Sequence, residues 1–259
     1  MNNNQCIVLF PVYRSLDETE LKVLKQAVKM TEGYTCAFVT SQSFTPDESY
    51  EELKNLPVFR FNDAYFKSTY GYNQLMLSLE FYMRFENFEY ILIHQTDACL
   101  FKPELKYWCD RAYDYIGSPW YKPRKIDKTK LYRFLSKYCR FLYSERKIFR
   151  FKIFNNVGNG GLSLRKVDSF ISILKNIPAG IIEKYRENEK ESFWFEDVFW
   201  SIEAPQFTKN FKKPEINEAL HFSFEFSPEK AYEKIGNQLP FGCHGFNRYN
   251  PDFWKQFIK

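Results

Sequence analysis

Residues 89–97 read E-Y-I-L-I-H-Q-T-D and place a short apolar run directly before three polar side chains. The run at 89–94 predicts a buried β-strand, because a strand that is covered on both faces is continuously apolar. Gln95, Thr96 and Asp97 then follow the end of that strand. Comparable apolar runs upstream predict three further strands at 5–10, 34–40 and 58–61.

Helical patterns separate these four strands. Asp17 caps a pattern that runs to about Met30, and Gly33 ends it. Apolar spacing predicts another helix over 69–85, and a shorter one is expected at 46–54. The alternation of strands and helices implies an α/β fold with a mostly parallel central sheet and helices on both faces.

The chain beyond Asp97 shows weaker patterns. No internal repeat, low-complexity tract or linker divides it. We therefore expect one domain over residues 1–259, with residues 121–154 as a basic insertion. The expected elements are a short helix at 103–109, short strands at 113–116 and 162–165, helices at 166–176 and 195–202, and an irregular C-terminal stretch.

The composition excludes several classes of protein. No run approaches the 18 apolar residues of a transmembrane helix, and residues 1–5 lack the charged flank of a signal peptide. The six scattered cysteines form no Cys-x-x-Cys pair for zinc and no secreted disulfide framework, so we expect a cytoplasmic protein. Aromatic residues make up 20% of the chain, which suits either an aromatic core or surfaces that contact sugars or membranes.

The net charge of +5 comes from one segment, since residues 121–154 carry 12 lysines and arginines but only two acids. Apolar and basic side chains form two helical stripes over 127–143, as is typical of a helix on an anionic membrane surface. An ordinary surface helix packed on the domain would show the same pattern. Nucleic acid is a weaker partner, because no nucleic-acid motif is present and the rest of the chain is acidic. The basic stripe consists of Lys130, Arg133, Lys137 and Arg140.

The carboxyl ends of parallel strands share one sheet edge, and ligands of such sheets bind there. Pro11–Arg14, Thr40-Ser41 and Gln95–Asp97 should all gather at this edge. A carboxylate such as Asp97 suits Mg²⁺ or Mn²⁺ in that position, because these ions bind protein carboxylates together with phosphate oxygens. Asp97 could equally cap the turn that follows it.

Three later motifs could also carry chemistry. Gly158-Asn159-Gly160-Gly161 allows the backbone to approach a ligand closely, or forms a tight turn before a strand. Glu196 and Asp197 lie among aromatic residues, which raise the proton affinity of a carboxylate and suit a general base, although acids also favour helix N-termini. His244 lies in a glycine-rich loop and could either complete a metal site or be structural.

Seven motifs occur in order along the chain. They are Y-N-Q-L-M at 72–76, I-L-I-H-Q-T-D at 91–97, D-Y-I-G-S-P-W at 114–120, G-N-G-G-L-S-L-R at 158–165, E-D-V-F at 196–199, A-L-H-F-S-F-E at 219–225 and P-F-G-C-H-G at 240–245. Over roughly residues 60–250, this series resembles a GT-A-type glycosyltransferase-like family of polysaccharide gene clusters. The resemblance implies a single domain of the GT-A type.

The resemblance also implies roles for individual residues. Asp97 matches the second, metal-binding acid of the Asp-x-Asp motif of GT-A enzymes. Gln95 stands in place of the first acid and would hydrogen-bond the ribose or the sugar. His244 matches a late histidine that completes the metal site in several such families. Asp197 is then the catalytic base, with Glu196 in reserve.

The remaining contacts follow from the same resemblance. The segment after the first strand would line the nucleotide, and Lys67 or Arg165 would add positive charge near the diphosphate. The donor-binding residues are then Pro11, Tyr13, Arg14, Thr40, Lys67, Asn73, Gln95 and Asp97, and the substrate-binding residues are Trp120, Asn159, Gly160, Gly161 and Arg165.

Taken together, the resemblance implies a glycosyltransferase that uses Mn²⁺ or Mg²⁺ and moves a sugar from a nucleotide-sugar, by default a UDP-sugar, to a glycan hydroxyl with inversion. In bacterial surface polysaccharide synthesis the acceptor would be linked to undecaprenyl diphosphate, on the inner face of the cytoplasmic membrane. Three alternatives stay open. These are a retaining transferase, a glycoside hydrolase with carboxylates across a cleft, and a non-catalytic sugar- or membrane-binding module with a degenerate site at Gln95.

Overall fold

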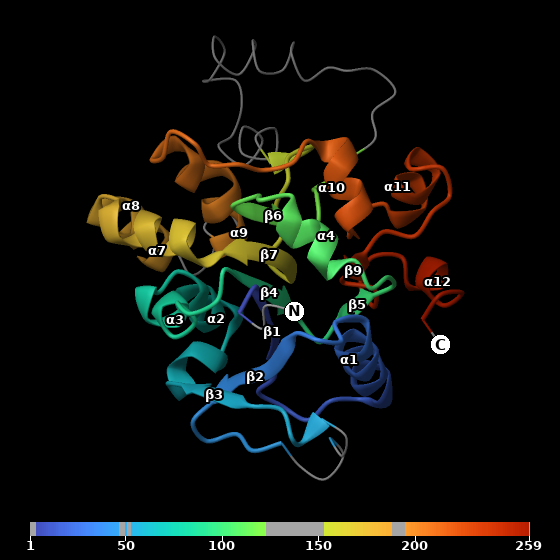
Figure 1. Cartoon of the computed structure of the whole chain (residues 1–259), viewed down its shortest axis with the longest axis horizontal. Coiled ribbons are helices and arrows are strands. Elements are labelled where there is room, and N and C mark those ends of the chain that lie inside the picture. The colour runs from blue at the N-terminus through green and yellow to red at the C-terminus, as the bar shows by residue number, and fades with distance from the viewer. Residues whose placement is uncertain (1–3, 47–49, 51–52, 123–152, 188–194, 259) are drawn as a thin grey trace.

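A six-stranded sheet with the order β3-β2-β1-β4-β7-β6 forms the centre of the computed structural model (Figure 1). The structure describes the chain except for residues 1–3, 47–49, 51–52, 123–152, 188–194 and 259. Strands β1 to β4 run parallel, whereas β7 runs antiparallel to β4 and β6. The predicted α/β class with a mostly parallel central sheet is therefore confirmed. The strands are β1 Cys6–Pro11, β2 Thr35–Ser41, β3 Val58–Phe61, β4 Tyr90–His94, β6 Tyr115–Gly117 and β7 Leu162–Lys166.

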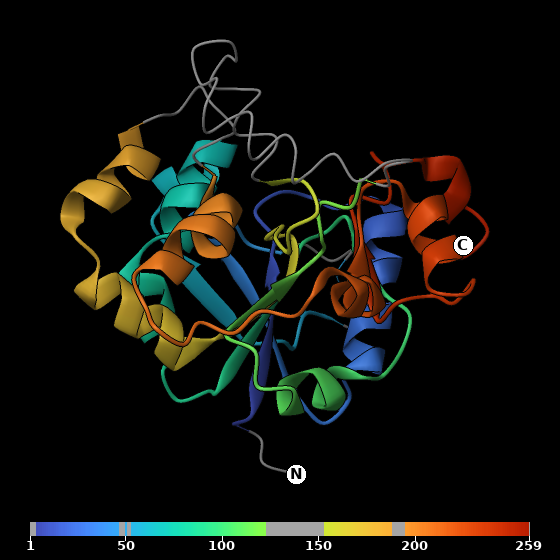
Figure 2. The same ribbon diagram turned by 90° about the horizontal axis from the view of Figure 1, so that it is seen from above.

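Side chains of β1 alternate between two hydrophobic cores on opposite faces of the sheet, as the period of a strand requires. Val8 and Phe10 belong to one core, and Ile7 and Leu9 belong to the other. Helices cover both faces, as predicted (Figure 2). The first core includes residues of α1 Glu18–Met30, α4 Leu105–Asp110, α10 Ile216–Phe222, α11 Pro228–Lys234 and α12 Pro251–Trp254. The second includes residues of α2 Thr69–Met76, α3 Leu79–Met83, α7 Val167–Asn176 and α8 Ala179–Glu187.

The single helix predicted over 69–85 is wrong, because the chain forms two helices there. Helix α2 ends at Met76, and the side chain of Ser78 accepts a hydrogen bond from the backbone N–H of Phe81 to begin α3. The apolar spacing continues across the break, so periodicity alone could not reveal it. The short helix predicted at 46–54 falls largely on residues outside the described part of the chain.

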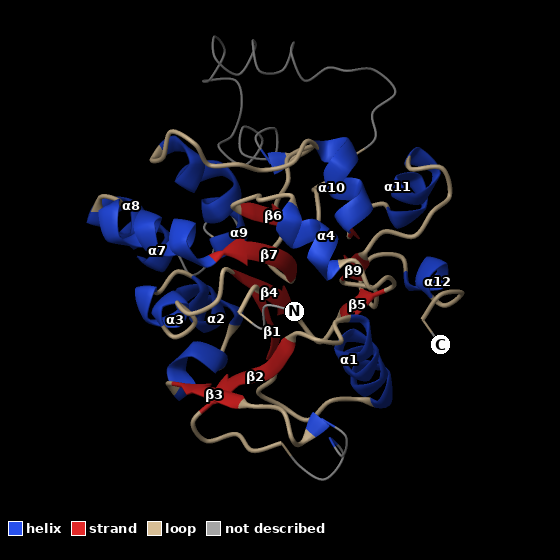
Figure 3. Ribbon diagram, viewed as in Figure 1, coloured by secondary structure: helices blue, strands red, loops and turns tan. Residues whose placement is uncertain are grey.

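The C-terminal region forms a second, three-stranded sheet where an irregular stretch was predicted (Figure 3). Strand β9 Gly242–His244 lies between β5 Ala98–Leu100 and β8 Ser223–Phe224. In the antiparallel β5–β9 pair, Ala98 is opposite His244. This pairing places His244 beside Ala98, and therefore next to Asp97.

The described residues on the two sides of the predicted basic insertion are hydrogen-bonded to each other. The backbone N–H of Trp120 donates to the carbonyl of Asn156, and that of Asn155 donates to the carbonyl of Trp120. The four basic residues predicted to contact a membrane, Lys130, Arg133, Lys137 and Arg140, lie outside the described residues. Within the described part of the chain, every helix is too short or too polar to cross a membrane.

Candidate active site

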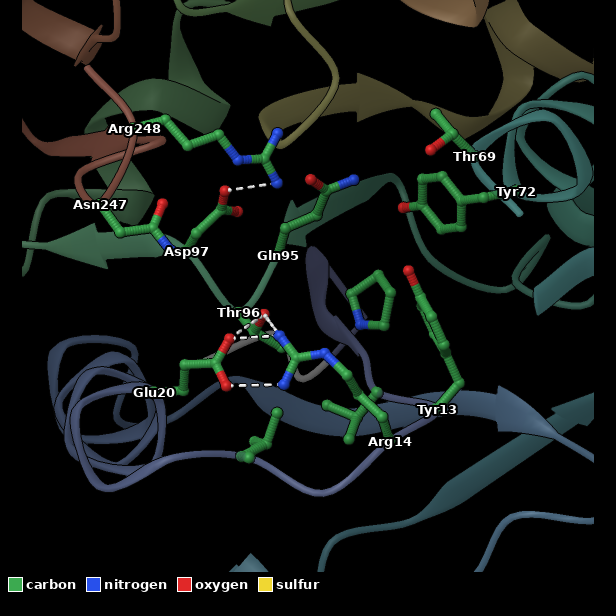
Figure 4. Close-up of a pocket in the computed structure, with 13 residues that line it drawn as sticks. Tyr13, Arg14, Glu20, Thr69, Tyr72, Gln95, Thr96, Asp97, Asn247 and Arg248 are labelled. Carbon is green, nitrogen blue, oxygen red and sulfur yellow. Dashed lines mark hydrogen bonds and ion pairs between the residues drawn. The ribbon is translucent and has the colours of Figure 1, made fainter. Parts of the chain in front are cut away.

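A cavity of about 250 Å³ opens at the carboxyl ends of β1 and β4 (Figure 4). This is the edge at which sheets of this type bind their ligands. Four separate segments line the cavity, so it exists only in the folded chain. They are the end of β1 with the start of α1 (Pro11, Val12, Tyr13, Arg14, Leu16 and Glu20), helix α2 (Thr69 and Tyr72), the end of β4 (Gln95, Thr96 and Asp97), and the loop after β9 (Asn247 and Arg248).

Asp97 lies in the tight turn between β4 and β5, where backbone hydrogen bonds hold it in place. The N–H of Ala98 donates to the carbonyl of Gln95 over 3.0 Å, and the N–H of Gly245 donates to the carbonyl of Asp97 over 2.9 Å. The N–H of Gln95 donates to the carbonyl of Gly161 over 2.8 Å. Thus the end of β4 is tied both to the turn before β7 and to the loop after β9.

The ring of His244 lies between two carboxylates. Its Nε2 atom is 3.2 Å from Oδ1 of Asp97 and 3.2 Å from Oε1 of Gln95, while its Nδ1 atom is 3.4 Å from Oε1 of Glu225. All three charged side chains are buried, with exposed fractions of 8% or less. The structure thus brings together Asp97 and His244, which the sequence analysis assigned to one metal site, and it adds Gln95 and Glu225 to the cluster.

The charges of this cluster stabilise one another. Burial alone would raise the pKa of Asp97, but the hydrogen bond and charge of His244, together with Arg248, outweigh it and lower that pKa to about 2. Burial alone would lower the pKa of His244, but its contacts with Asp97 and Glu225 outweigh it and raise that pKa to about 10. In the ligand-free chain the imidazole therefore serves as the buried cation between the two acids.

Glu20 connects the start of α1 to the cavity. Its two carboxylate oxygens accept hydrogen bonds from Arg14, at 2.8 Å from Nη1 and 2.5 Å from Nη2. The hydroxyl of Thr96 donates to Oε1 of Glu20 over 2.8 Å. The same carboxylate also accepts from the backbone N–H of Asp17, and so completes the capping box of α1. One buried acid thus fixes the helix start, Arg14 and Thr96 together.

Two tyrosines form the side of the cavity next to α2. The side chain of Tyr13 is 42% exposed and packs on Phe66 with ring centroids 5.3 Å apart. Tyr72 is 7% exposed, and its hydroxyl has no hydrogen-bond partner among the described residues. Figure 4 shows both hydroxyls directed into the cavity. A buried hydroxyl without a partner is costly, so this cavity presents a polar atom ready for a ligand.

The glycine motif at 158–161 forms the tight turn before β7, which is one of the two interpretations of the sequence. A Cβ atom at Gly158 would overlap the ring of Trp120, one at Gly160 would overlap the carboxylate of Glu196, and one at Gly161 would overlap the ring of His244. The absence of a Cβ atom at these glycines therefore lets three side chains pack directly against the backbone. Asn159 supplies the left-handed residue of the turn, with φ 70°, and its side chain accepts from the N–H of Gly161.

Arg165 is not positioned to contact a diphosphate, which corrects the prediction. Its side chain is fully buried, and Nη2 lies 3.0 Å from Oε1 of Glu196. Its other atoms donate to the hydroxyls of Tyr82 and Ser163. Glu196 is also buried, at 5% side-chain exposure, and is held in this ion pair. Both residues are therefore part of the interior that supports the glycine turn.

Asp197 differs from its neighbour because it is partly exposed. Its Oδ1 atom accepts a hydrogen bond from the backbone N–H of Val198 over 2.7 Å. Burial, followed by the negative charges of Glu196 and Glu225, raises the pKa of Asp197 to about 7. A carboxyl group with this pKa exchanges a proton readily at neutral pH.

Several other predicted contact residues lie outside the cavity lining. Thr40 is fully buried in β2, and Trp120 is buried against Gly158. Asn73 is a structural bridge, because its side chain donates to the carbonyl of Thr69 and accepts from the N–H of Glu196. Lys67 is exposed beside the short helix η2 Asp63–Phe66. The predicted residues that do line the cavity are Pro11, Tyr13, Arg14, Gln95 and Asp97.

Sequence reasoning missed five residues of this region. Glu20 could have been found from the capping-box spacing Asp17-x-x-Glu20. Tyr72 and Glu225 stand inside two of the quoted motifs, but no pattern distinguishes their roles. Thr69 and Arg248 carry no signal, because only the fold brings them to the edge of the sheet. Over the described residues, no three His, Cys, Asp or Glu side chains form a metal-binding group, and the third donor atom beside Oδ1 of Asp97 and Nε2 of His244 is Oε1 of Gln95.

Comparison with known proteins gives a family and a likeness to solved structures. The chain resembles a solved structure described as a glycosyltransferase involved in the glycosylation of the major capsid of PBCV-1, with a TM-score of 0.49 and 11% identity over 97% of this chain and 98% of that one. No curated protein sequence matches. Residues 55–244 match the model of a family described as proteins of unknown function, DUF5672. Because this match spans well over half of the 259 residues, the chain belongs to the DUF5672 family.

Proposed function

We propose that this protein is a glycosyltransferase that moves a sugar from a nucleotide-sugar to a hydroxyl of a glycan acceptor, with a divalent cation on the diphosphate of the donor. One observation carries the proposal. Asp97, Gln95 and His244 converge at the ligand-binding edge of the sheet, beside a cavity lined by Tyr13 and Arg248. An aromatic ring, an arginine and a carboxylate suit the base, the phosphates and a cation of a nucleoside diphosphate, respectively.

The donor atoms of the cluster fit Mn²⁺ or Mg²⁺. Nε2 of His244 lies 3.2 Å from an oxygen of Asp97 and 3.2 Å from an oxygen of Gln95. Adjacent ligands of an octahedral ion with bonds of about 2.1 Å lie about 3 Å apart, so these separations match. Glu225 lies on the far ring nitrogen of His244, and metal-ligating histidines usually have such a carboxylate there. A bound cation would neutralise the charge that develops on the departing nucleoside diphosphate.

Asp197 is the proposed catalytic base: it is partly exposed and lies outside the cavity lining, but it is near enough to Glu225 of the cluster for that carboxylate to raise its pKa. Its pKa of about 7 allows it to accept the proton of an acceptor hydroxyl at neutral pH. The hydroxyl oxygen then attacks the anomeric carbon, the bond from that carbon to the diphosphate breaks, and the configuration inverts. Glu196 does not take this role in the proposal, because Arg165 holds it in a buried ion pair.

The finer points of the proposal concern the donor and the acceptor. UDP-sugar is the first donor class to test, and the acceptor is a glycan, linked to a lipid diphosphate if the basic segment contacts a membrane. A sugar-binding module without turnover is the second candidate. It is favoured by Gln95, which occupies the place of an acid in the motif of GT-A enzymes.

A thermal-shift screen tests the proposal. The protein is heated with UDP, GDP, CDP or dTDP, each with and without Mn²⁺. A ligand at a hundredfold excess over its Kd stabilises the folded state by about 2.7 kcal/mol. We expect one nucleotide to raise the midpoint only with Mn²⁺, and Asp97→Ala to abolish the shift. Asp168→Ala is the matched control, because this exposed acid of α7 lies at the start of a helix. The absence of any nucleotide shift would contradict the proposal.

A further inference from the structure

Arg248 contacts Asp97 on the oxygen that does not face His244. Its Nη2 atom lies 3.2 Å from Oδ2 of Asp97 (Figure 4). Nε2 of His244 lies near the other oxygen, Oδ1. The Arg248 side chain is 68% exposed, although the carboxylate it contacts is only 6% exposed. The contact is an ion pair without hydrogen-bond geometry, since Oδ2 has no hydrogen-bond partner among the described residues. A charge contact of this kind is easily exchanged.

The other arginine of the cavity is held more firmly. Both terminal nitrogens of Arg14 donate to the carboxylate of Glu20, which is itself buried and fixed at the start of α1. Bidentate pairing of this kind orients a guanidinium and satisfies its charge. Of the two arginines that line the cavity, Arg248 is therefore the one whose charge can be transferred to a ligand.

The backbone of Arg248 is anchored beside the carboxylate. The N–H of Gly245 donates to the carbonyl of Asp97 over 2.9 Å, and the N–H of Arg248 donates to the carbonyl of Gly245 over 3.0 Å. Gly245 adopts φ 66°, which favours glycine and closes this turn. Rotation of the side chain alone is then sufficient to move the guanidinium away from Asp97.

A divalent cation and a guanidinium repel each other at one carboxylate. The buried carboxylate of Asp97 needs positive charge beside it, and a divalent cation held by its Oδ1 atom and Nε2 of His244 removes the need for Arg248 on Oδ2. We infer that Arg248 exchanges partners: it neutralises Asp97 in the nucleotide-free chain and passes to the diphosphate when a divalent cation takes Asp97. This inference rests on the proposed function. The Arg248–Asp97 ion pair competes with both ligands, because it occupies the carboxylate that the cation needs and the guanidinium that the diphosphate needs. Either ligand breaks this ion pair, so the cation and the nucleoside diphosphate bind cooperatively.

The exchange predicts opposite effects of one substitution on two ligands. Mn²⁺ binding to Arg248→Gln is followed by the electron paramagnetic resonance signal of free Mn²⁺, without nucleotide. We expect the variant to bind Mn²⁺ several-fold more tightly than the wild type. Binding of UDP, GDP, CDP and dTDP is then measured at saturating Mn²⁺. Here we expect the variant to lose about tenfold or more in affinity for the nucleotide that the wild type prefers, since a charge-assisted contact to phosphate is lost.

Two further variants make the result specific. Arg248→Lys keeps the charge, so its affinities for Mn²⁺ and for the nucleotide should lie between those of the wild type and those of Arg248→Gln. Arg111→Gln removes an exposed arginine that pairs with Glu218 away from the cavity, and it should leave both affinities unchanged. Unchanged or weaker Mn²⁺ binding by Arg248→Gln, or unchanged nucleotide binding, would overturn the exchange. If the wild type binds Mn²⁺ but no nucleotide, the proposed function fails, and the transfer of Arg248 to a diphosphate fails with it.

Discussion

Oε1 of Glu225 lies 3.4 Å from Nδ1 of His244, on the side of the ring away from Asp97. Glu225 is 3% exposed, and its other carboxylate oxygen has no hydrogen-bond partner among the described residues. A carboxylate in this place holds a proton on Nδ1, so that Nε2, which faces Asp97 and Gln95, is the ring nitrogen that gives up its proton when a cation binds. Glu225 therefore acts through His244, as a positioning residue.

Glu225 would not contact the metal itself, but its substitution should still weaken metal binding. We expect Glu225→Gln to lower the affinity for Mn²⁺ by about 10- to 100-fold, as measured by calorimetric titration in the presence of nucleotide. Glu218→Gln is the matched control, because Glu218 lies on α10 and pairs with Arg111. Equal Mn²⁺ affinity in Glu225→Gln and the wild type would contradict the positioning role of Glu225.

Asp197 should control the pH dependence of transfer. We expect Asp197→Asn to reduce kcat by about 10²- to 10⁴-fold while nucleotide affinity stays the same. The asparagine oxygen can still accept from the N–H of Val198, so the fold is retained. Because the pKa of Asp197 is raised to about 7, kcat/KM of the wild type should rise with pH through about 7 and then level off.

The same raised pKa affects stability in a predictable direction. The folded state keeps the Asp197 proton that the unfolded chain releases near pH 4, so this contribution favours folding at low pH and is lost as pH rises through about 7. Asp197→Asn should therefore flatten the fall in unfolding free energy between pH 5 and 8, measured by urea denaturation. A rise with pH attributable to Asp197, or a constant kcat/KM across this range, would contradict the role of this residue.

Gly161 is predicted to tolerate no side chain, because a Cβ atom there would overlap the ring of His244. We expect Gly161→Ala to cost about 1–3 kcal/mol of unfolding free energy and to abolish the Mn²⁺-dependent nucleotide shift, since the ring must move. Gly180→Ala is the control, because nothing lies within 4 Å of its Cβ position in α8. That change should leave binding intact and be neutral or slightly stabilising. Full nucleotide binding by Gly161→Ala would count against the role of His244.

The basic segment predicts contact with anionic membranes. Reversing the charges of Lys130, Arg133, Lys137 and Arg140 together should abolish binding to vesicles that contain anionic lipid, measured by sedimentation. Binding of the wild type should fall as salt is added, because the attraction is electrostatic. If the charge-reversed variant sediments with the vesicles as the wild type does, the membrane prediction is wrong.

The parallel half of the sheet could be predicted from the sequence, because β1, β2 and β4 are short, continuous apolar runs, as is typical of buried strands. The second sheet was missed, because strands such as Ser223–Phe224 contain too few residues to show a period. The same limit hid the break in the helix at Ser78, where apolar spacing continues into the next helix. Elements were therefore predictable where the pattern was long, and not where it was short.

The candidate site was predictable at the strand ends and less so elsewhere. Asp97 and His244, which the resemblance assigned to one metal site, lie together in the structure, and Gln95 lies beside them because it follows the same strand as Asp97. Glycine in a sequence shows only that a Cβ atom is absent, so the side chains that occupy the space at Gly160 and Gly161 could not be foreseen. The burial of Arg165 was hidden for a similar reason, since its partner Glu196 lies in a distant helix.

The most direct test of the central claim is the position of the cation itself. Crystals grown with Mn²⁺ and the preferred nucleoside diphosphate would be measured at the manganese absorption edge, and the anomalous difference map would locate the ion. We expect one peak beside Oδ1 of Asp97 and Nε2 of His244, with the diphosphate next to it. A nucleotide bound in the cavity without a manganese peak at these two side chains would contradict the claim that Asp97 and His244 hold the metal.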